Sequence, residues 1–278
     1  MTILVNLINS LGVFLSGWFV APFEGTHPFW PIAVVSLVTA VAMLWVFGKL
    51  SNQEAIRIVR QRIRGNLLAV RLYQHDLKIV MYLQKKILVD TFIYLRYSLG
   101  PFLVMVIPIV LILAQLQLYF SVQPAQVDES LIIRAVVADP EILQDTIPEL
   151  VADSDSVRVE TPAVRSLEDG EVAWRIKPLR PGRHTITLRI ESRGVTKLLV
   201  VGEDWTGVPF LRSNSSLDAL LYPGEEMIPD GEPFTAVEIG YDPLPILLAG
   251  WDFHWLVLFF LLSLLFALLL KKPMGVEI

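Results

Sequence analysis

The feature that most constrains this chain is a basic stretch, residues 51–98, which lies between two segments long and apolar enough to cross a bilayer. From Lys49 to Ser98 the chain holds ten Lys or Arg against three acids, whereas the 48 residues before Lys49 hold no Lys or Arg. Cytoplasmic loops of membrane proteins carry such an excess of Lys and Arg. We therefore expect this stretch in the cytoplasm, between two transmembrane helices.

Two patterns within the basic stretch repeat every seven residues. Apolar residues from Ile56 to Ile87 follow the a and d spacing of a coiled coil. Beside this seam runs a basic row, which consists of Arg57, Arg64, Arg71, Lys78 and Lys85. The only internal turn signal is Gly65-Asn66, and a chain that leaves a bilayer and returns to it must reverse. We therefore predict a cytoplasmic helical hairpin over residues 51–97, with a short first arm, a turn at Gly65-Asn66 and a longer second arm.

Hydropathy and flanking residues together predict the membrane topology. Three apolar segments have the length of a transmembrane helix: residues 30–50, 98–120 and 251–272. Aromatic residues gather at one end of these segments, and lysines follow the other end of the first and third. Both patterns place the hairpin and the tail, residues 273–278, in the cytoplasm. Inside the second helix, Pro108 is expected to produce a kink.

The N-terminal segment, residues 1–29, is predicted to form an apolar or amphipathic helix and a short loop. Its polar and small residues fall close to one helical stripe: Asn6, Asn9, Ser10, Ser16 and Gly17. Two interpretations remain open, because such a stripe suits either an amphipathic helix at the membrane interface or the inward face of a spanning helix. The prolines that crowd the short connection to the next segment favour the interfacial helix.

We predict an all-β domain outside the cytoplasm for residues 121–250, the long segment between the second and third predicted transmembrane helices. Its apolar residues alternate or cluster over six short segments, and Arg180-Pro-Gly-Arg183 supplies a hairpin turn. Several short strands with regular turns are typical of an immunoglobulin-like β-sandwich. The six predicted strands are Leu131–Ala138, Val157–Glu160, Val172–Leu179, His184–Ile190, Thr196–Gly202 and Phe234–Tyr241.

The expected fold is thus an α-helical membrane protein, with three transmembrane helices and a cytoplasmic helical hairpin, into which an extracytoplasmic β-sandwich is inserted. From Ser121 to Gly250 the chain holds 22 acids and 11 bases, which disfavours DNA as a partner. There is no cysteine, no glycine-rich phosphate loop, no nucleophile elbow and no paired-histidine motif. We therefore expect neither enzymatic activity nor a bound metal or cofactor.

One combination of elements resembles a known family. A span, a basic cytoplasmic hairpin and a second span with Gly-Pro and an internal Pro-Ile (SLGPFLVMVIPIVLIL) are similar to the core of the YidC/Oxa/Alb insertase superfamily, in particular its reduced three-span members. The resemblance covers residues 30–120 and the final span. The chain departs from many bacterial members because its first span holds no arginine, and because its β-domain follows the second span instead of preceding the core.

The resemblance implies a membrane-protein insertase or intramembrane chaperone, in which a polar groove carries the hydrophilic end of a client protein across the bilayer. On this view the groove residues are Arg96, Pro108, Gln115 and Gln117. The basic row would hold anionic lipid headgroups or ribosomal RNA near the entry. The implied partners are nascent or client membrane proteins, anionic lipid and the ribosome, and the implied location is a prokaryotic inner (cytoplasmic) membrane.

An alternative function is that of an envelope scaffold. In this hypothesis the extracytoplasmic immunoglobulin-like domain binds a partner protein, and the membrane helices only anchor and oligomerise it. The size and acidity of the segment 121–250 motivate the alternative.

The predicted topology is tested by reporter fusions. A reporter that is active only outside the cytoplasm should be active when fused after Val200 and silent when fused after Asn66, because the charge bias places these sites on opposite sides of the membrane. The reverse pair of results would contradict the topology and both functional hypotheses.

Overall fold

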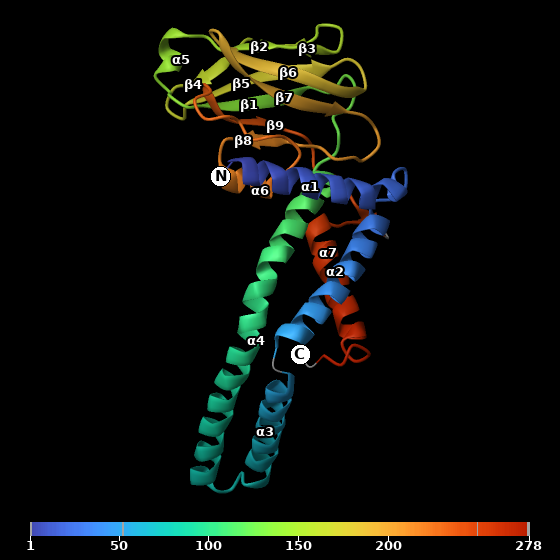
Figure 1. The fold of residues 1–278 in the computed structure, drawn as a ribbon, viewed down its shortest axis with the longest axis vertical. Coiled ribbons are helices and arrows are strands. Elements are labelled where there is room, and N and C mark those ends of the chain that lie inside the picture. The colour runs from blue at the N-terminus through green and yellow to red at the C-terminus, as the bar shows by residue number, and fades with distance from the viewer. Residues whose placement is uncertain (1, 52, 249, 277–278) are drawn as a thin grey trace. The chain divides into compact units, whose positions relative to one another are not determined.

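The computed structural model describes residues 2–51, 53–248 and 250–276. Over these residues the chain is a mixed protein, with helices at both ends and a β-sheet region between them (Figure 1). The helices are α1 (Thr2–Val20), the 3₁₀-helix η1 (Ala21–Phe23), α2 (Phe29–Leu50), α3 (Gln53–Leu72), α4 (Leu77–Phe120), α5 (Ile142–Asp145), α6 (Ser216–Leu221) and α7 (Trp255–Leu270).

The described residues form two compact units. One contains the segment through Pro31 together with Val110–Trp255, and we refer to it as the β unit. The other contains Ile32–Ile109 and the segment from Leu256 onward, and we refer to it as the helical unit. Three helices, α1, α2 and α4, are long and apolar enough to cross a membrane, which suggests membrane association.

The cytoplasmic hairpin predicted from the sequence turns at a different place. Gly65-Asn66 lies inside α3, and the chain reverses after Leu72 and resumes as α4 at Leu77. Asp76 caps the new helix, because its Oδ1 accepts hydrogen bonds from the amides of Lys78 and Ile79 at 3.0 and 3.2 Å. A glycine inside a helix costs only about 1 kcal/mol, so the heptad pattern overrides it. The prediction of a turn at Gly65-Asn66 was therefore wrong, and the first arm, α3, is longer than expected.

Helix α4 contains 44 residues and combines two predicted segments, the second arm of the hairpin and the span 98–120. Neither Gly100-Pro101 nor Pro108 ends it. The third predicted span is shorter than expected, because α7 contains 16 residues, or about 24 Å of helix. The chain before it folds back as two short strands, and Asp252 Oδ1 accepts a hydrogen bond from the amide of Ile246 at 3.1 Å.

Inside the helical unit, a small apolar cluster joins several helices. Its buried residues come from α2, α3, α4 and the segment after α7: Leu44, Phe47, Ile56, Met105 and Val276. Two polar contacts add to it. Ser36 Oγ donates to the carbonyl of Phe259 in α7 at 3.3 Å, and Asn66 Nδ2 on α3 donates to Asp90 Oδ2 on α4 at 3.2 Å. The second bond ties the two arms of the hairpin together.

The β-sheet region contains three sheets. Strands β3, β5, β1, β9 and β8 follow one another across the largest sheet, with β4 paired to β5; the second sheet has the order β2-β6-β7, and β10 pairs with β11. Every pairing between two of the described strands is antiparallel. The strands are β1 (Leu131–Val137), β2 (Glu149–Val151), β3 (Val157–Val159), β4 (Val164–Ser166), β5 (Glu171–Pro178), β6 (Gly182–Ile190), β7 (Arg193–Val201), β8 (Leu211–Ser213), β9 (Phe234–Ile239), β10 (Leu247–Leu248) and β11 (Trp251–Asp252).

The two larger sheets share one hydrophobic core. It takes alternate residues from both, among them Ile133 of β1, Trp174 of β5 and Leu188 of β6. Five of the six predicted strands overlap observed strands closely, and the sixth, β7, begins three residues earlier than expected. The predicted hairpin turn Arg180-Pro-Gly-Arg183 is instead a crossing between the sheets, because β5 pairs within the first sheet and β6 within the second.

The packing of this core predicts a clear difference between two neighbouring isoleucines. Ile133→Ala should lower the free energy of unfolding of the β unit by about 2–5 kcal/mol, because it removes a fully buried side chain. Ile132 lies on the opposite face of β1 and is 42% exposed, so Ile132→Ala is the matched control and should cost much less. Urea unfolding of the detergent-solubilised protein, followed by the rate of proteolysis, measures both. Equal losses for the two variants would contradict the assignment of the core face.

Candidate functional site

The predicted basic row is divided between two helices. Arg57, Arg64 and Arg71 lie on α3, whereas Lys78 and Lys85 lie beyond the turn, on α4. All five side chains are exposed, and none has an ion pair with another described residue. The three arginines share one face of α3 by their spacing. The row is therefore a basic surface on both arms of a hairpin instead of the edge of one rod.

The predicted groove residues fall into different units. Arg96 is exposed and Pro108 is half-buried, and both belong to the part of α4 in the helical unit. Gln115 and Gln117 are half-buried and belong to the end of α4 in the β unit. Gln115 Oε1 accepts a hydrogen bond from Ser16 Oγ of α1 at 3.4 Å. The observed contact of Gln115 is therefore with α1.

Within the β unit, α1 contacts the rest of the unit through its polar stripe. Asn9 is buried, and its Nδ2 donates a hydrogen bond to the carbonyl of Ala219 in α6 at 2.6 Å. One turn earlier, Asn6 Oδ1 accepts a hydrogen bond from the amide of Met227 at 3.3 Å. Next to Asn6, Val5 packs with Ala219 and Met227 in a small apolar cluster. The polar stripe, for which the sequence left two interpretations open, thus contacts other residues of the same chain.

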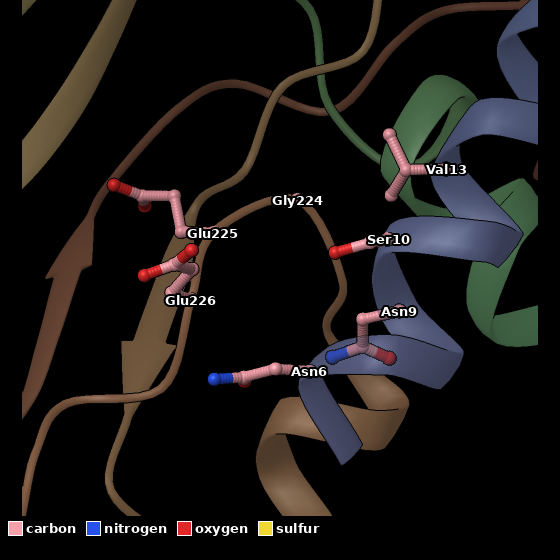
Figure 2. A pocket seen from close by; sticks show the side chains of 7 residues that line it. All are labelled: Asn6, Asn9, Ser10, Val13, Gly224, Glu225 and Glu226. Atoms are coloured by element: carbon pink, nitrogen blue, oxygen red, sulfur yellow. The ribbon is translucent and has the colours of Figure 1, made fainter. Parts of the chain in front are cut away.

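A small cavity lies beside this docking surface. Its volume is about 150 Å³, and Figure 2 shows α1 on one side and the loop Gly224–Glu226 on the other. The α1 side presents the amides of Asn6 and Asn9 and the hydroxyl of Ser10, and the loop presents two carboxylates, Glu225 and Glu226. Pockets for drug-sized ligands usually measure about 300–1,000 Å³. This volume is better matched to a polar packing gap than to a substrate site.

A buried ion pair joins the loop Gly224–Glu226 to β7. The Lys197 side chain on β7 is fully buried, and its Nζ donates hydrogen bonds to Glu225 Oε2 and to the carbonyl of Pro209. Burial lowers the pKa of the Lys197 ammonium, and the Glu225 carboxylate opposes that shift. The second carboxylate oxygen, Glu225 Oε1, accepts a hydrogen bond from the amide of Leu198 at 2.8 Å. The pair therefore anchors the loop that α1 contacts.

Glu225 is one of several residues that cover the free edge of β7. On the edge opposite β6, the carbonyl of Thr196 accepts a hydrogen bond from Arg212 Nη1. Farther along, the amide of Val200 donates to the hydroxyl of Tyr241 at 3.0 Å. Ala125 then pairs with the end of the strand, because its amide donates to the carbonyl of Val200 at 3.1 Å. Burial raises the pKa of the Tyr241 phenol, which therefore stays protonated over the physiological range.

The described residues contain no group of three His, Asp or Glu that could hold a metal ion. What the β unit offers chemically is a set of fixed hydrogen bonds around one buried pair. Reasoning from the sequence missed Lys197 and Glu225, although a signal was present: the inward positions of β7 are Val195, Lys197, Leu199 and Val201, so the lysine interrupts an apolar face. A lysine at a core position of a strand requires a partner.

Comparisons with known proteins find no family model and no curated protein that matches this chain. Among solved structures, domains 4 and 5 of the S-layer protein SbsC match with 10% identity and a TM-score of 0.22, over 30% of this chain and 48% of that chain. A longer part of the same protein, rSbsC(31-844), matches with 13% identity and a TM-score of 0.23, over 48% of this chain and 22% of that chain. The chain thus spans less than half the length of either, and TM-scores this low carry no argument about its function.

The buried pair predicts a non-additive response to mutation. Glu225→Gln should destabilise the β unit by about 3–5 kcal/mol, because it leaves the Lys197 ammonium buried without its countercharge. The double variant Lys197→Met with Glu225→Gln should lose much less. The matched control is Lys177→Met, which removes a partly exposed ion pair with Asp128 and should cost at most about 1 kcal/mol. Urea unfolding measures all three, and a Glu225→Gln loss no larger than that of the control would contradict the role of the pair.

Proposed function

We propose that this protein is a membrane-protein insertase or intramembrane chaperone that works without a bound cofactor. In this proposal it resides in a prokaryotic inner (cytoplasmic) membrane, with the α3–α4 hairpin in the cytoplasm and the β unit, an immunoglobulin-like sandwich, outside. The resemblance of residues 30–120 to the YidC/Oxa/Alb core motivates the proposal. Its support in the helical unit is the uncovered middle of α4.

The uncovered middle of α4 is the observation that carries the proposal. Between Leu99 and Ile107 apolar side chains are exposed on most sides of the helix, and only Pro101 and Met105 are buried. Leu103 and Ile107 are 65% and 67% exposed. A helix so weakly covered by its own chain leaves room in the bilayer for another apolar helix beside it.

The same part of α4 supplies polar groups where a client would pass. Pro101 and Pro108 have no amide hydrogen, so the carbonyls of Tyr97 and Val104 lose their helical donors. An unsatisfied polar group in hydrocarbon costs several kcal/mol. Local hydration around such carbonyls would lower the barrier for the polar end of a client, with no covalent chemistry.

The charged residues of the hairpin fit the entry of this path. Arg96 lies at the inner mouth of the second span and would attract acidic client segments. The basic row, Arg57, Arg64, Arg71, Lys78 and Lys85, is exposed on both arms and would hold anionic lipid headgroups or ribosomal RNA. In the proposal, the partners are therefore nascent membrane proteins, anionic lipid and the ribosome.

The envelope scaffold is the second candidate, and one observation favours it. The β unit has its own continuous hydrophobic core and holds α1, so an extracytoplasmic partner would find a preformed binding domain. A scaffold would bind one stable partner through this unit. An insertase would instead contact many short-lived clients through α4.

Photo-crosslinking separates the two functions. A photoreactive amino acid at Leu103 or Ile107 should crosslink to short-lived nascent membrane proteins in living cells, because these positions face the uncovered side of α4. The matched control is Leu269 on α7, which has a similar exposure of 63% and should crosslink to fewer clients.

Two outcomes would contradict the insertase. One is equal client crosslinking at Leu103, Ile107 and Leu269, which would indicate random contact in the bilayer. The other is the absence of clients at α4 while the β unit captures one stable partner, which would favour the scaffold. Deleting residues 125–240 gives an independent comparison, because a scaffold then loses its partner.

A further inference from the structure

Helix α1 carries two opposed faces, and its apolar face is the exposed one. The exposed apolar stripe consists of Ile3, Leu7, Leu11, Phe14 and Trp18, with exposed fractions from 59% to 86%. Their spacing of three or four residues places them on one side of the helix. The helix has no charged residue. A soluble protein would turn this stripe toward its core, so its outward position requires an apolar partner.

The opposite face of α1 is held by the β unit at both ends. Its first half contacts α6 and Met227 through Asn6 and Asn9. Its second half contacts the last two turns of α4: Gly12 and Ser16 lie against Gln115, and Gly17 lies against Tyr119. At Gly12 an added Cβ atom would lie within 2.5 Å of the Gln115 amide nitrogen, so the two helices approach closely there.

These contacts are incompatible with a spanning helix. Sheets with free edges and a surface rich in carboxylates cannot enter hydrocarbon, since their backbone groups would lose the water that satisfies them. The half of α1 that carries Asn6 and Asn9 is bonded to that domain and must stay at its level. Figure 1 accordingly shows α1 lying across the end of α4.

We propose that α1 binds the surface of the lipid bilayer on the side of the β unit. It lies in the membrane plane, with its apolar stripe in the boundary between headgroups and acyl chains and its polar face on the protein. Trp18 suits that depth, because tryptophan favours the interface, and Phe14 is typical of the apolar face of an interfacial helix. The absence of charge matches a hydrophobic contact that does not depend on anionic lipid. This inference does not depend on the insertase function.

Spin labels at single cysteines test the orientation, because the chain has no native cysteine. The full-length protein carries one label at a time at Ile3, Leu7, Leu11, Phe14 or Trp18, in vesicles of phosphatidylcholine and phosphatidylglycerol. The ratio of collisions with oxygen to collisions with a water-soluble nickel complex reports the depth of each label. Leu103 on α4 serves as the deep reference and Ile147 on the β unit, 64% exposed, as the aqueous reference.

An interfacial helix gives the same intermediate depth at all five positions. From Ile3 to Trp18 the helix rises by about 22 Å, so a spanning α1 would show a depth that changes steadily through the bilayer, which would overturn the proposal. Water-like values at all five labels would also overturn it. So would low access to both reagents together with spin–spin broadening, which would mean that a second copy of the chain covers the stripe.

Discussion

A peptide group that enters hydrocarbon without a hydrogen-bond partner costs several kcal/mol, and this constraint accounts for the division of the chain. In the helical unit the long apolar segments are helices, which satisfy their backbone internally. The β unit needs water or side chains at its sheet edges, so it belongs outside the bilayer. Helix α4 meets the constraint over 44 residues except at its two prolines. Those two positions are therefore where backbone polarity can enter the apolar part of α4 that follows Arg96.

Two polar devices in the β unit are linked through one loop. Lys197 forms an ion pair with Glu225. Two residues after Glu225, the amide of Met227 donates a hydrogen bond to Asn6 of α1. The buried pair thus fixes the backbone that receives the helix. Removing the charge of Lys197 would therefore affect the contact with α1, although no hydrogen bond between described residues joins Lys197 to α1.

Periodic patterns made most of the fold predictable, and isolated tertiary contacts did not. Alternation predicted β1 and β5 because each of these strands buries one full face. The turn before α4 was missed because its signal is a single capping residue, Asp76, whereas Gly65-Asn66 has the stronger local composition. For the candidate site, hydropathy predicted Arg96 at the inner mouth of the second span, and Arg96 lies inside the continuous helix α4. The contact of Gln115 with α1 could not be predicted from the sequence, because it joins residues 99 positions apart.

The closure of the β7 edge has a consequence for how these molecules coexist. An edge strand with free amides and carbonyls is a template on which a strand of a neighbouring molecule can add. Arg212, Glu225, Tyr241 and Ala125 occupy those groups one after another. They act as a surrogate strand, contributed by four separate segments of the same chain. Copies of the protein held in one membrane can then lie side by side without pairing their β7 edges into a continuous sheet.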